Sequence, residues 1–202
     1  MSQIMNINCR RLCIIALLAL VAAIPASSQQ SAADIQEMLE DRDREIKSLL
    51  GKSDNISAEQ KEQLRAVIND VIDFHAMGQA SLGRHWNRLS NEQQGEFIDV
   101  FSKIVRSQSL ADLDVFRSSV AYDVITVTGE EAHVFTTTIY KHVPTSVEYE
   151  LRYDEGRWLA IDIILDEVST VKGYSRSFQS IIRKKGFDEL MKRLRKKLNE
   201  TA

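Results

Sequence analysis

The spacing of apolar residues changes twice along the chain, and this change constrains the fold more than any other feature of the sequence. Before Val120 and after Gly173, apolar residues recur every three to four positions, as on one face of a helix. Over residues 120–168 they alternate with polar residues, as in strands that bury one face. Gly129, Pro144 and Gly156 mark short turns between these strands. The pattern predicts an α+β domain with helices packed on one antiparallel sheet.

Capping signals give several helix boundaries. Ser57 is followed by Gln60 and Ser90 by Gln93, the spacing of a capping box, so helices are expected to begin there. We expect Gly51, Gly83 and Gly186 to end helices and Asp188 to cap the last helix. The predicted elements are helices within 34–117, strands at 121–128, 132–142, 146–153 and 158–168, and C-terminal helices over 174–200.

The alternation also predicts which strand residues share a face. The third strand is expected to place four apolar side chains together: Val147, Tyr149, Leu151 and Tyr153. The fourth strand is expected to do the same with Leu159, Ile161, Ile163 and Leu165. The face of the fourth strand is apolar enough to be buried.

The N-terminal residues have the pattern of a secretory signal peptide. Arg10 and Arg11 precede an apolar run, Leu12 to Ile24, which is short for a membrane span, and small residues follow it. We expect a cleaved signal peptide at 1–28, a mature domain at 29–202, and a periplasmic location. Cleavage removes Cys9 and Cys13, which leaves no disulfide, thiol nucleophile or thiolate ligand.

Charge is distributed unevenly along the chain. The formal net charge is −3, and loss of Arg10 and Arg11 makes it more negative, so general nucleic-acid binding is not expected. From Lys172 to Glu200, however, ten Lys or Arg stand against three Asp or Glu. This basic stretch is interpreted as a solvated helix face, a membrane-surface helix, or a docking face for an acidic partner.

The stretch Val71–Trp86, VIDFHAMGQASLGRHW, resembles a reactive site because it contains His75, His85 and Arg84. No two histidines of the mature chain have the i, i+4 spacing that places two ligands on one helix face. Neither a metal site nor a catalytic site is therefore expected here, and no role is assigned to the two histidines.

Asp162 is the one candidate catalytic group, because it lies in an otherwise apolar strand. A carboxylate that faces an apolar cavity could act as a general base, which would suit a small enzyme of the ketosteroid-isomerase type. The favoured interpretation is structural: Asp162 faces outward or pairs with Arg152 or Arg157 across a hairpin. A third alternative is a cargo-free docking module that acts through the basic C-terminal helices.

Three segments resemble the MlaC/toluene-tolerance family of periplasmic phospholipid carriers, an auxiliary component of ABC transporters. The first is DFHAMGQASLGRHWNRLSNEQQGEFIDVF, with matches at Asp73, Phe74, Met77, Ser81, Leu82, Gly83, Trp86, Ser90, Gln93, Phe97 and Phe101. The second contains Trp158, Asp162 and Val168-Ser169, and the third is IIRKKGFDELMKRL. Glu167 stands where the family has a glycine before Val-Ser, so we expect that turn to differ.

The resemblance implies a fold and a function. The fold would be a helical subdomain on a curved four-stranded antiparallel sheet, a cone of the nuclear-transport-factor kind with an internal apolar cavity. The function would be to shuttle glycerophospholipid and so maintain outer-membrane lipid asymmetry. Its partners would be an inner-membrane ABC transporter complex with its substrate-binding-domain ring and an outer-membrane lipoprotein–porin complex. We expect a monomer without enzymatic activity, cofactor or metal, with phospholipid as cargo.

The predicted cavity wall combines the helix stripes with the strand faces. The helices are expected to contribute Phe74, Met77, Leu82, Trp86, Phe97 and Phe101. The sheet is expected to contribute Val147, Tyr149, Leu151, Ile161 and Ile163. Four residues are expected near the mouth: Val168, Val171, Tyr174 and Phe178. Ordinary core packing is the alternative role for each of them.

Overall fold

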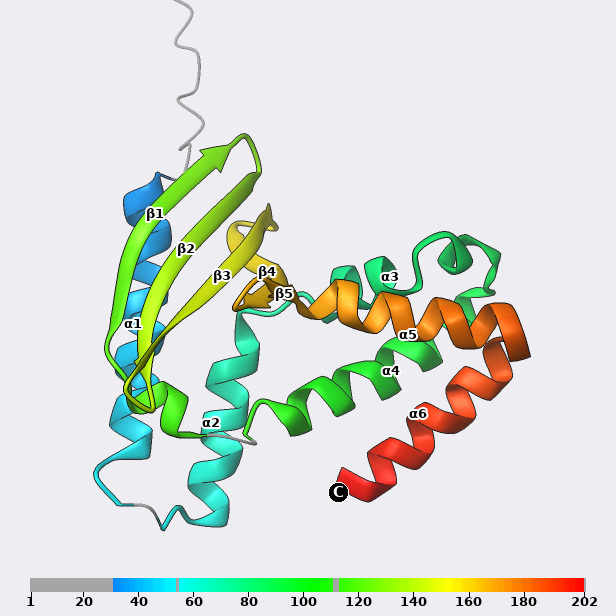
Figure 1. Ribbon diagram of the computed structural model, residues 1–202, viewed down its shortest axis with the longest axis horizontal. Helices are drawn as coiled ribbons and strands as arrows, with labels where there is room; N and C mark the ends of the chain where they lie inside the picture. The colour runs from blue at the N-terminus through cyan, green and yellow to red at the C-terminus, as the bar shows by residue number, and fades with distance from the viewer. Residues whose placement is uncertain (1–30, 54, 111–112, 202) are drawn as a thin grey trace, which may run out of the picture.

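One antiparallel sheet with strand order β1-β2-β3-β4-β5 forms one half of the molecule, as the computed structural model in Figure 1 shows. The structure describes residues 31–53, 55–110 and 113–201, so the expected signal peptide lies outside it. The strands are β1 (Val120–Thr128), β2 (Glu131–Tyr140), β3 (Val143–Asp154), β4 (Arg157–Leu165) and β5 (Val168–Ser169). The predicted antiparallel sheet is confirmed, with the two-residue β5 as an additional strand and with open edges.

The helices fall into two groups. The first group is α1 (Ala32–Leu50) and α2 (Ala58–Asp70). The second group is α3 (Phe74–Leu82), the 3₁₀ helix η1 (Gly83–Arg88), α4 (Asn91–Gln108), α5 (Thr170–Lys185) and α6 (Phe187–Thr201). A second 3₁₀ helix, η2 (Leu113–Arg117), leads into β1. Among the described helices, none is both long enough and apolar enough to cross a membrane.

Local sequence signals explain most helix ends. Ser57 and Ser90 each form the expected capping box with the residue three positions later. Gly51, Gly83 and Gly186 end their helices, as predicted. Asp188 does not cap the last helix, because Gly186 alone separates α5 from α6 and Asp188 lies in the first turn of α6.

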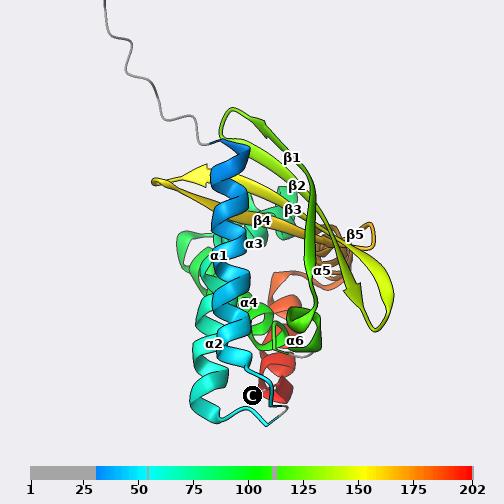
Figure 2. The same ribbon diagram turned by 90° about the vertical axis from the view of Figure 1, so that its left-hand side faces the viewer.

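Three groups of buried residues define the interior, and the smallest joins α1 to α2 through Ile46, Leu50 and Leu64. The sheet core joins α1 to the strands through Ile35, Leu39, Ala132, Val134, Leu151, Trp158 and Ala160. The helical core joins α3, α4, α5 and α6, and its members include Met77, Leu82, Phe97, Phe101, Phe178, Leu190 and Met191. Ile163 on β4 packs against both cores. Figure 2 shows α1 lying across the twisted sheet, on the side away from α5 and α6.

A β-bulge in β4 changes the predicted faces of that strand. Ala160 pairs with Leu151 and Asp162 with Glu150, so Ile161 is an extra residue between two register positions. Because one extra residue reverses the alternation, Leu159 and Ile161 lie on the opposite face from Ile163 and Leu165. The prediction that these four residues share one face is therefore wrong. Pro144 is also not in a turn: it pairs with Ile139 within the β2–β3 ladder.

Candidate functional site

One carboxylate fixes the N-terminus of α5 to β4. Asp162 Oδ1 accepts hydrogen bonds from the backbone N–H groups of Ile163, at 2.9 Å, and Val171, at 3.0 Å. Its Oδ2 accepts a hydrogen bond from the Ser169 hydroxyl. That hydroxyl oxygen in turn accepts the N–H of Lys172 at 3.0 Å, so Ser169 is the N-cap of α5. Asp162 therefore sets the direction in which α5 leaves the sheet.

Aromatic side chains hold α5 against α4. The rings of Tyr174 and Phe101 meet edge to face with centroids 5.2 Å apart, and Phe178 meets Phe97 in the same way at 5.9 Å. The Tyr174 hydroxyl donates a hydrogen bond to Gln108 Oε1 over 2.6 Å. Burial raises the pKa of Tyr174, so this side chain is a neutral hydrogen-bond donor at physiological pH.

An apolar pocket of about 570 Å³ lies beside these rings, between α4, α5, α6 and the β4–β5 turn. We call it the α4–α5–α6 pocket. Its apolar wall consists of Phe101, Ile104, Leu165, Val168, Tyr174, Phe178, Ile181, Leu190 and Leu194. Leu165 and Val168 are 48% and 59% exposed, so the pocket meets solvent at apolar side chains of the turn. Exposed apolar residues at the edge of an apolar pocket are the features expected of an entrance for an apolar ligand.

The residues predicted for the helical wall and for the mouth separate into two groups. Four predicted residues line the α4–α5–α6 pocket: Phe101, Val168, Tyr174 and Phe178. Five others are buried in the helical core: Phe74, Met77, Leu82, Trp86 and Phe97. Val171 packs against the same core. In this conformation the core residues pack in the same cluster as Phe101 and Phe178 and do not line the pocket. Their contact with a ligand stays a prediction.

The predicted wall residues from the sheet lie away from this pocket. Leu151 is buried in the sheet core, and Tyr149 packs against that core. Burial, and then the nearby Asp43 of α1, raise the pKa of Tyr149 to about 12. Val147 shares their face of β3 and is partly buried. Ile161, on the opposite face, lines a separate shallow hollow with Trp86. The lipid-binding role of the sheet residues stays a prediction.

Sequence reasoning missed five apolar residues of the pocket: Ile104, Leu165, Ile181, Leu190 and Leu194. Each belongs to an apolar stripe that the sequence shows. Periodicity identifies the stripe of one helix but not which part of it meets two other helices. No local signal could have separated pocket residues from core residues here.

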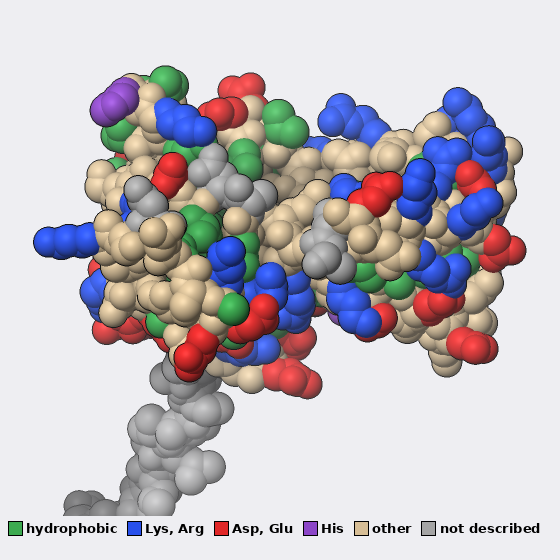
Figure 3. Space-filling view, turned by 90° about the horizontal axis from the view of Figure 1, so that it is seen from below, with side chains coloured by type: hydrophobic (Ala, Val, Ile, Leu, Met, Phe, Trp, Pro, Cys, Tyr) green, Lys and Arg blue, Asp and Glu red, His purple; other side chains and the backbone are tan. Residues whose placement is uncertain are grey.

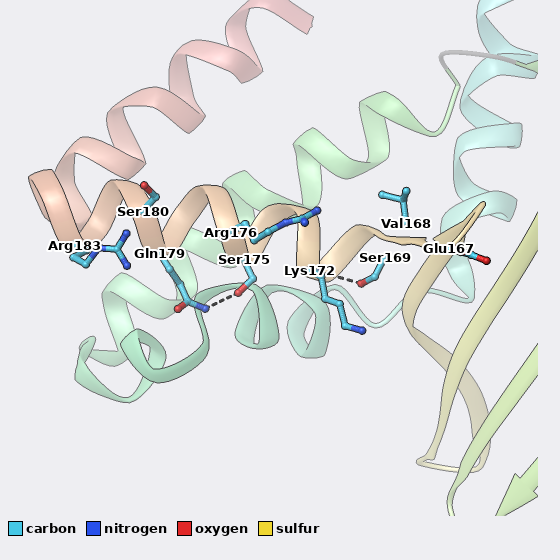
Figure 4. A pocket seen from close by; sticks show the side chains of 9 residues that line it. All are labelled: Glu167, Val168, Ser169, Lys172, Ser175, Arg176, Gln179, Ser180 and Arg183. Carbon is cyan, nitrogen blue, oxygen red and sulfur yellow. Dashed lines mark hydrogen bonds between the residues drawn. The ribbon is translucent and has the colours of Figure 1, made fainter.

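A larger hollow of about 650 Å³ lies on another face of α5, and its wall is polar (Figure 4). Lys172, Arg176 and Arg183 line it together with serine and glutamine side chains. Figure 4 shows the Gln179 side chain pointing to Ser175, where Nε2 donates a hydrogen bond over 2.5 Å. A polar, cationic wall does not suit an acyl chain, so this groove is not the candidate site for an apolar ligand.

The candidate catalytic groups have structural partners. Both oxygens of Asp162 bind the start of α5, and Asp162 does not line the α4–α5–α6 pocket. Arg152 pairs with Asp73 at 2.7 Å and Arg157 with Asp70 at 3.5 Å. The expected alternative, in which one of these arginines pairs with Asp162, is therefore wrong. The geometry therefore does not favour the isomerase alternative.

The histidines also have structural surroundings. His75 packs edge to face against Trp86, with ring centroids 5.3 Å apart. His133 Nε2 lies 2.8 Å from a carboxylate oxygen of Glu148 on the neighbouring strand. Within the part of the chain that the structure describes, no three His, Cys, Asp or Glu side chains form a group that could hold a metal ion.

Comparisons with known proteins identify a family and a fold. The family model described as "MlaC protein" matches residues 36–196. No curated protein sequence matches the chain. Among solved structures, the chain is similar to a phospholipid-binding protein from Ralstonia solanacearum in complex with a phospholipid, with a TM-score of 0.70 and 22% identity. The match covers 84% of this chain and 97% of that protein, and at this identity it shows a shared fold.

Proposed function

The chain belongs to the MlaC protein family, and from this membership we propose that it is a periplasmic carrier of glycerophospholipid. In this proposal it is exported by a cleaved signal peptide and shuttles lipid between outer-membrane and inner-membrane complexes. This exchange would maintain the lipid asymmetry of the outer membrane. The α4–α5–α6 pocket, with its apolar wall and exposed apolar edge, is the observation that carries the proposal.

The physical need for a carrier follows from the cost of exposing acyl chains to water. A two-chain lipid has roughly 30 methylenes, and each costs about 0.8 kcal/mol to expose. The total exceeds about 20 kcal/mol, which is near the limit of non-covalent affinity. If the protein pocket is about as apolar as a bilayer, lipid moves between membrane and protein with little change in free energy. Such a carrier needs no catalytic group, and we propose that this chain is not an enzyme.

The size of the pocket indicates how a lipid would be held. If each methylene takes about the volume of a water molecule, about 30 Å³, two chains fill about 900 Å³. The pocket measures about 570 Å³. We therefore propose that loading moves α5 and α6 away from α4, so that the helical core residues behind the wall also contact the chains. The polar head group would stay near solvent.

The partners in this proposal are those implied by the family resemblance. They are an inner-membrane ABC transporter complex with its ring of substrate-binding domains and an outer-membrane lipoprotein–porin complex. The phospholipid named for the structural relative supports the lipid class, since the two chains share a fold.

A direct test is native mass spectrometry of the chain after gentle purification. The expected result is a mass increase equal to that of one phospholipid, reproduced when delipidated protein is incubated with liposomes. A chain that is lipid-free from several hosts and takes up no lipid from liposomes would contradict the proposal.

A further inference from the structure

Three arginines that have no carboxylate partner among the described residues line one hollow, which shares no lining residue with the α4–α5–α6 pocket. The hollow measures about 460 Å³ and lies between η1, the end of α5 and the start of α6. Arg84 and Arg88 of η1 and Arg183 of α5 line it, together with His85. In sequence, α4 and the whole sheet lie between η1 and α5, so the fold brings these charges together.

These arginines differ from most others in the molecule. Arg42, Arg152 and Arg195, for example, each form an ion pair with an aspartate or glutamate. Among the described residues, no carboxylate lies within 4.0 Å of the guanidinium nitrogens of Arg84, Arg88 or Arg183, the limit for an ion pair. Three like charges around one hollow repel one another, and the attraction of a bound anion would offset that repulsion.

The imidazole of His85 lies close enough to all three arginines for their charges to affect its protonation. Burial, and then the charges of Arg84, Arg88 and Arg183, lower the pKa of the His85 imidazole. The Nε2 atom of this ring is also shielded from solvent and has no hydrogen-bond partner in the described structure. This ring nitrogen is therefore a buried polar atom without a hydrogen bond, and it lies in a strongly positive environment.

Part of the wall of the hollow is apolar. Leu89, Ile182 and Phe187 line it together with the arginines. Apolar neighbours lower the local dielectric constant and strengthen the attraction between a bound anion and the guanidinium groups. The polar groove of Figure 4 shares Arg183 with this hollow and continues along α5 to Arg176 and Lys172. Figure 3 shows that Lys and Arg side chains gather over the helical half of the molecule. Their field would draw anions toward this half.

We propose that the hollow lined by Arg84, Arg88 and Arg183 binds a phosphate group. Guanidinium groups present paired N–H donors that match the oxygens of phosphate, and a phosphate monoester carries close to two negative charges at neutral pH. A single carboxylate has fewer oxygens than a phosphate and only one negative charge, so it matches three arginines less well. The phosphate could belong to a lipid head group or be a free ion. This site is separate from the α4–α5–α6 pocket, so the inference does not rest on the proposed lipid cargo.

The test has two arms. In the first arm, the purified chain is titrated calorimetrically with inorganic phosphate at constant ionic strength. In the second arm, the chain is sedimented with vesicles of phosphatidylcholine that contain or lack phosphatidic acid, whose head group is a phosphate monoester. The double variant Arg84→Ala/Arg88→Ala removes two charges of the hollow. The control Arg44→Ala/Arg65→Ala removes two arginines that pair with nearby carboxylates on α1 and α2.

The expected result is saturable phosphate binding that falls at least tenfold in the Arg84/Arg88 variant and changes less than twofold in the control. Binding to phosphatidic acid vesicles alone, with the same loss, would identify the lipid head group as the source. The NMR signals of the His85 ring should shift as the hollow fills.

Three results would overturn the proposal. The first is no binding of phosphate in either arm, and the second is an equal loss in the two double variants, which would indicate a general charge effect. The third comes from a parallel calorimetric titration with polyglutamate: binding of this polyanion but not of phosphate, with the loss confined to the Arg84/Arg88 variant. That result would assign the arginines to docking of an acidic protein.

Discussion

The backbone N–H of Val171 donates a hydrogen bond to the carboxylate of Asp162 over 3.0 Å, and this contact connects the sheet to the helix that forms the pocket wall. Asp162 lies at the end of a bulged segment of β4, and Val171 lies in the first turn of α5. One side chain thereby positions Tyr174 and Phe178, which line the pocket one and two turns further along α5.

Removing this carboxylate should destabilise the fold. Asp162→Ala leaves the N–H groups of Val171 and Ile163 and the Ser169 hydroxyl without their acceptor. We therefore expect a loss of about 2–3 kcal/mol in the free energy of unfolding. Glu150 pairs with Asp162 across the β3–β4 ladder and is a matched carboxylate. Glu150→Ala should change stability by less than about 0.5 kcal/mol. Urea denaturation of both variants measures the difference, and equal losses would show that Asp162 has no special role.

Two glycines within helices should respond oppositely to the same substitution. A Cβ atom on Gly78 of α3 would lie 2.5 Å from Ile98 Cδ1, 3.2 Å from Phe97 and 3.3 Å from Phe101. We expect Gly78→Ala to destabilise the chain by about 1–2 kcal/mol, because the side chains of Ile98, Phe97 and Phe101 on α4 must move away. Gly95 on the exposed face of α4 has no atom within 4 Å of such a Cβ. Gly95→Ala should stabilise the chain by about 0.5–1 kcal/mol through helix propensity.

Thermal unfolding of the two alanine variants checks this contrast. A stabilised Gly78→Ala variant would mean that the helical core has free space between α3 and α4.

The lowered pKa of His85 predicts a pH dependence. Because the folded pKa lies below the usual value of 6.5, the unfolded chain binds a proton more readily than the folded chain. Stability contributed by the neutral ring is complete above that value and is lost as the pH falls from about 6.5 toward the folded pKa. The melting temperature, measured in phosphate-free buffer, should therefore fall more between pH 7.5 and 5.5 in the natural chain than in His85→Gln.

The matched comparison isolates His85 from carboxylates that also titrate in acid. Parallel pH profiles for the two chains would indicate that the ring is free to ionise in the fold.

Much of the fold could be predicted from local signals. The capping boxes at Ser57 and Ser90 gave correct helix starts, and period-two alternation gave the antiparallel sheet. The bulge at Ile161 could not be predicted, since an extra residue in β4 is fixed by its pairing with β3. The nine-residue α3 was also missed as a separate helix, because it is short and its packing depends on the close approach at Gly78.

The residues of the site could be predicted from the sequence less completely than the fold. Phe101, Tyr174 and Phe178 were predicted from the apolar stripes of their helices and line the pocket. Leu190 and Leu194 on α6 line it as well, because the single-residue connection at Gly186 folds α6 back toward α4. That arrangement depends on contacts between helices, which periodicity along one helix does not encode.

The most direct test of the central claim fills the α4–α5–α6 pocket without disturbing the core. Gly173 lines this pocket, and a Cβ placed on it would meet no atom within 4 Å. Gly173→Phe should therefore fold and occupy space that the acyl chains need. Gly95→Phe is the matched control, since Gly95 is also a helix glycine with open space around it.

The measurement is the amount of phospholipid bound per chain, read by native mass spectrometry after incubation with liposomes. The proposed function predicts about one phospholipid on the natural chain and on Gly95→Phe, and at least a fivefold lower loaded fraction on Gly173→Phe. Equal loading of Gly173→Phe would place the lipid elsewhere, and absence of lipid from all three chains would contradict the carrier function itself.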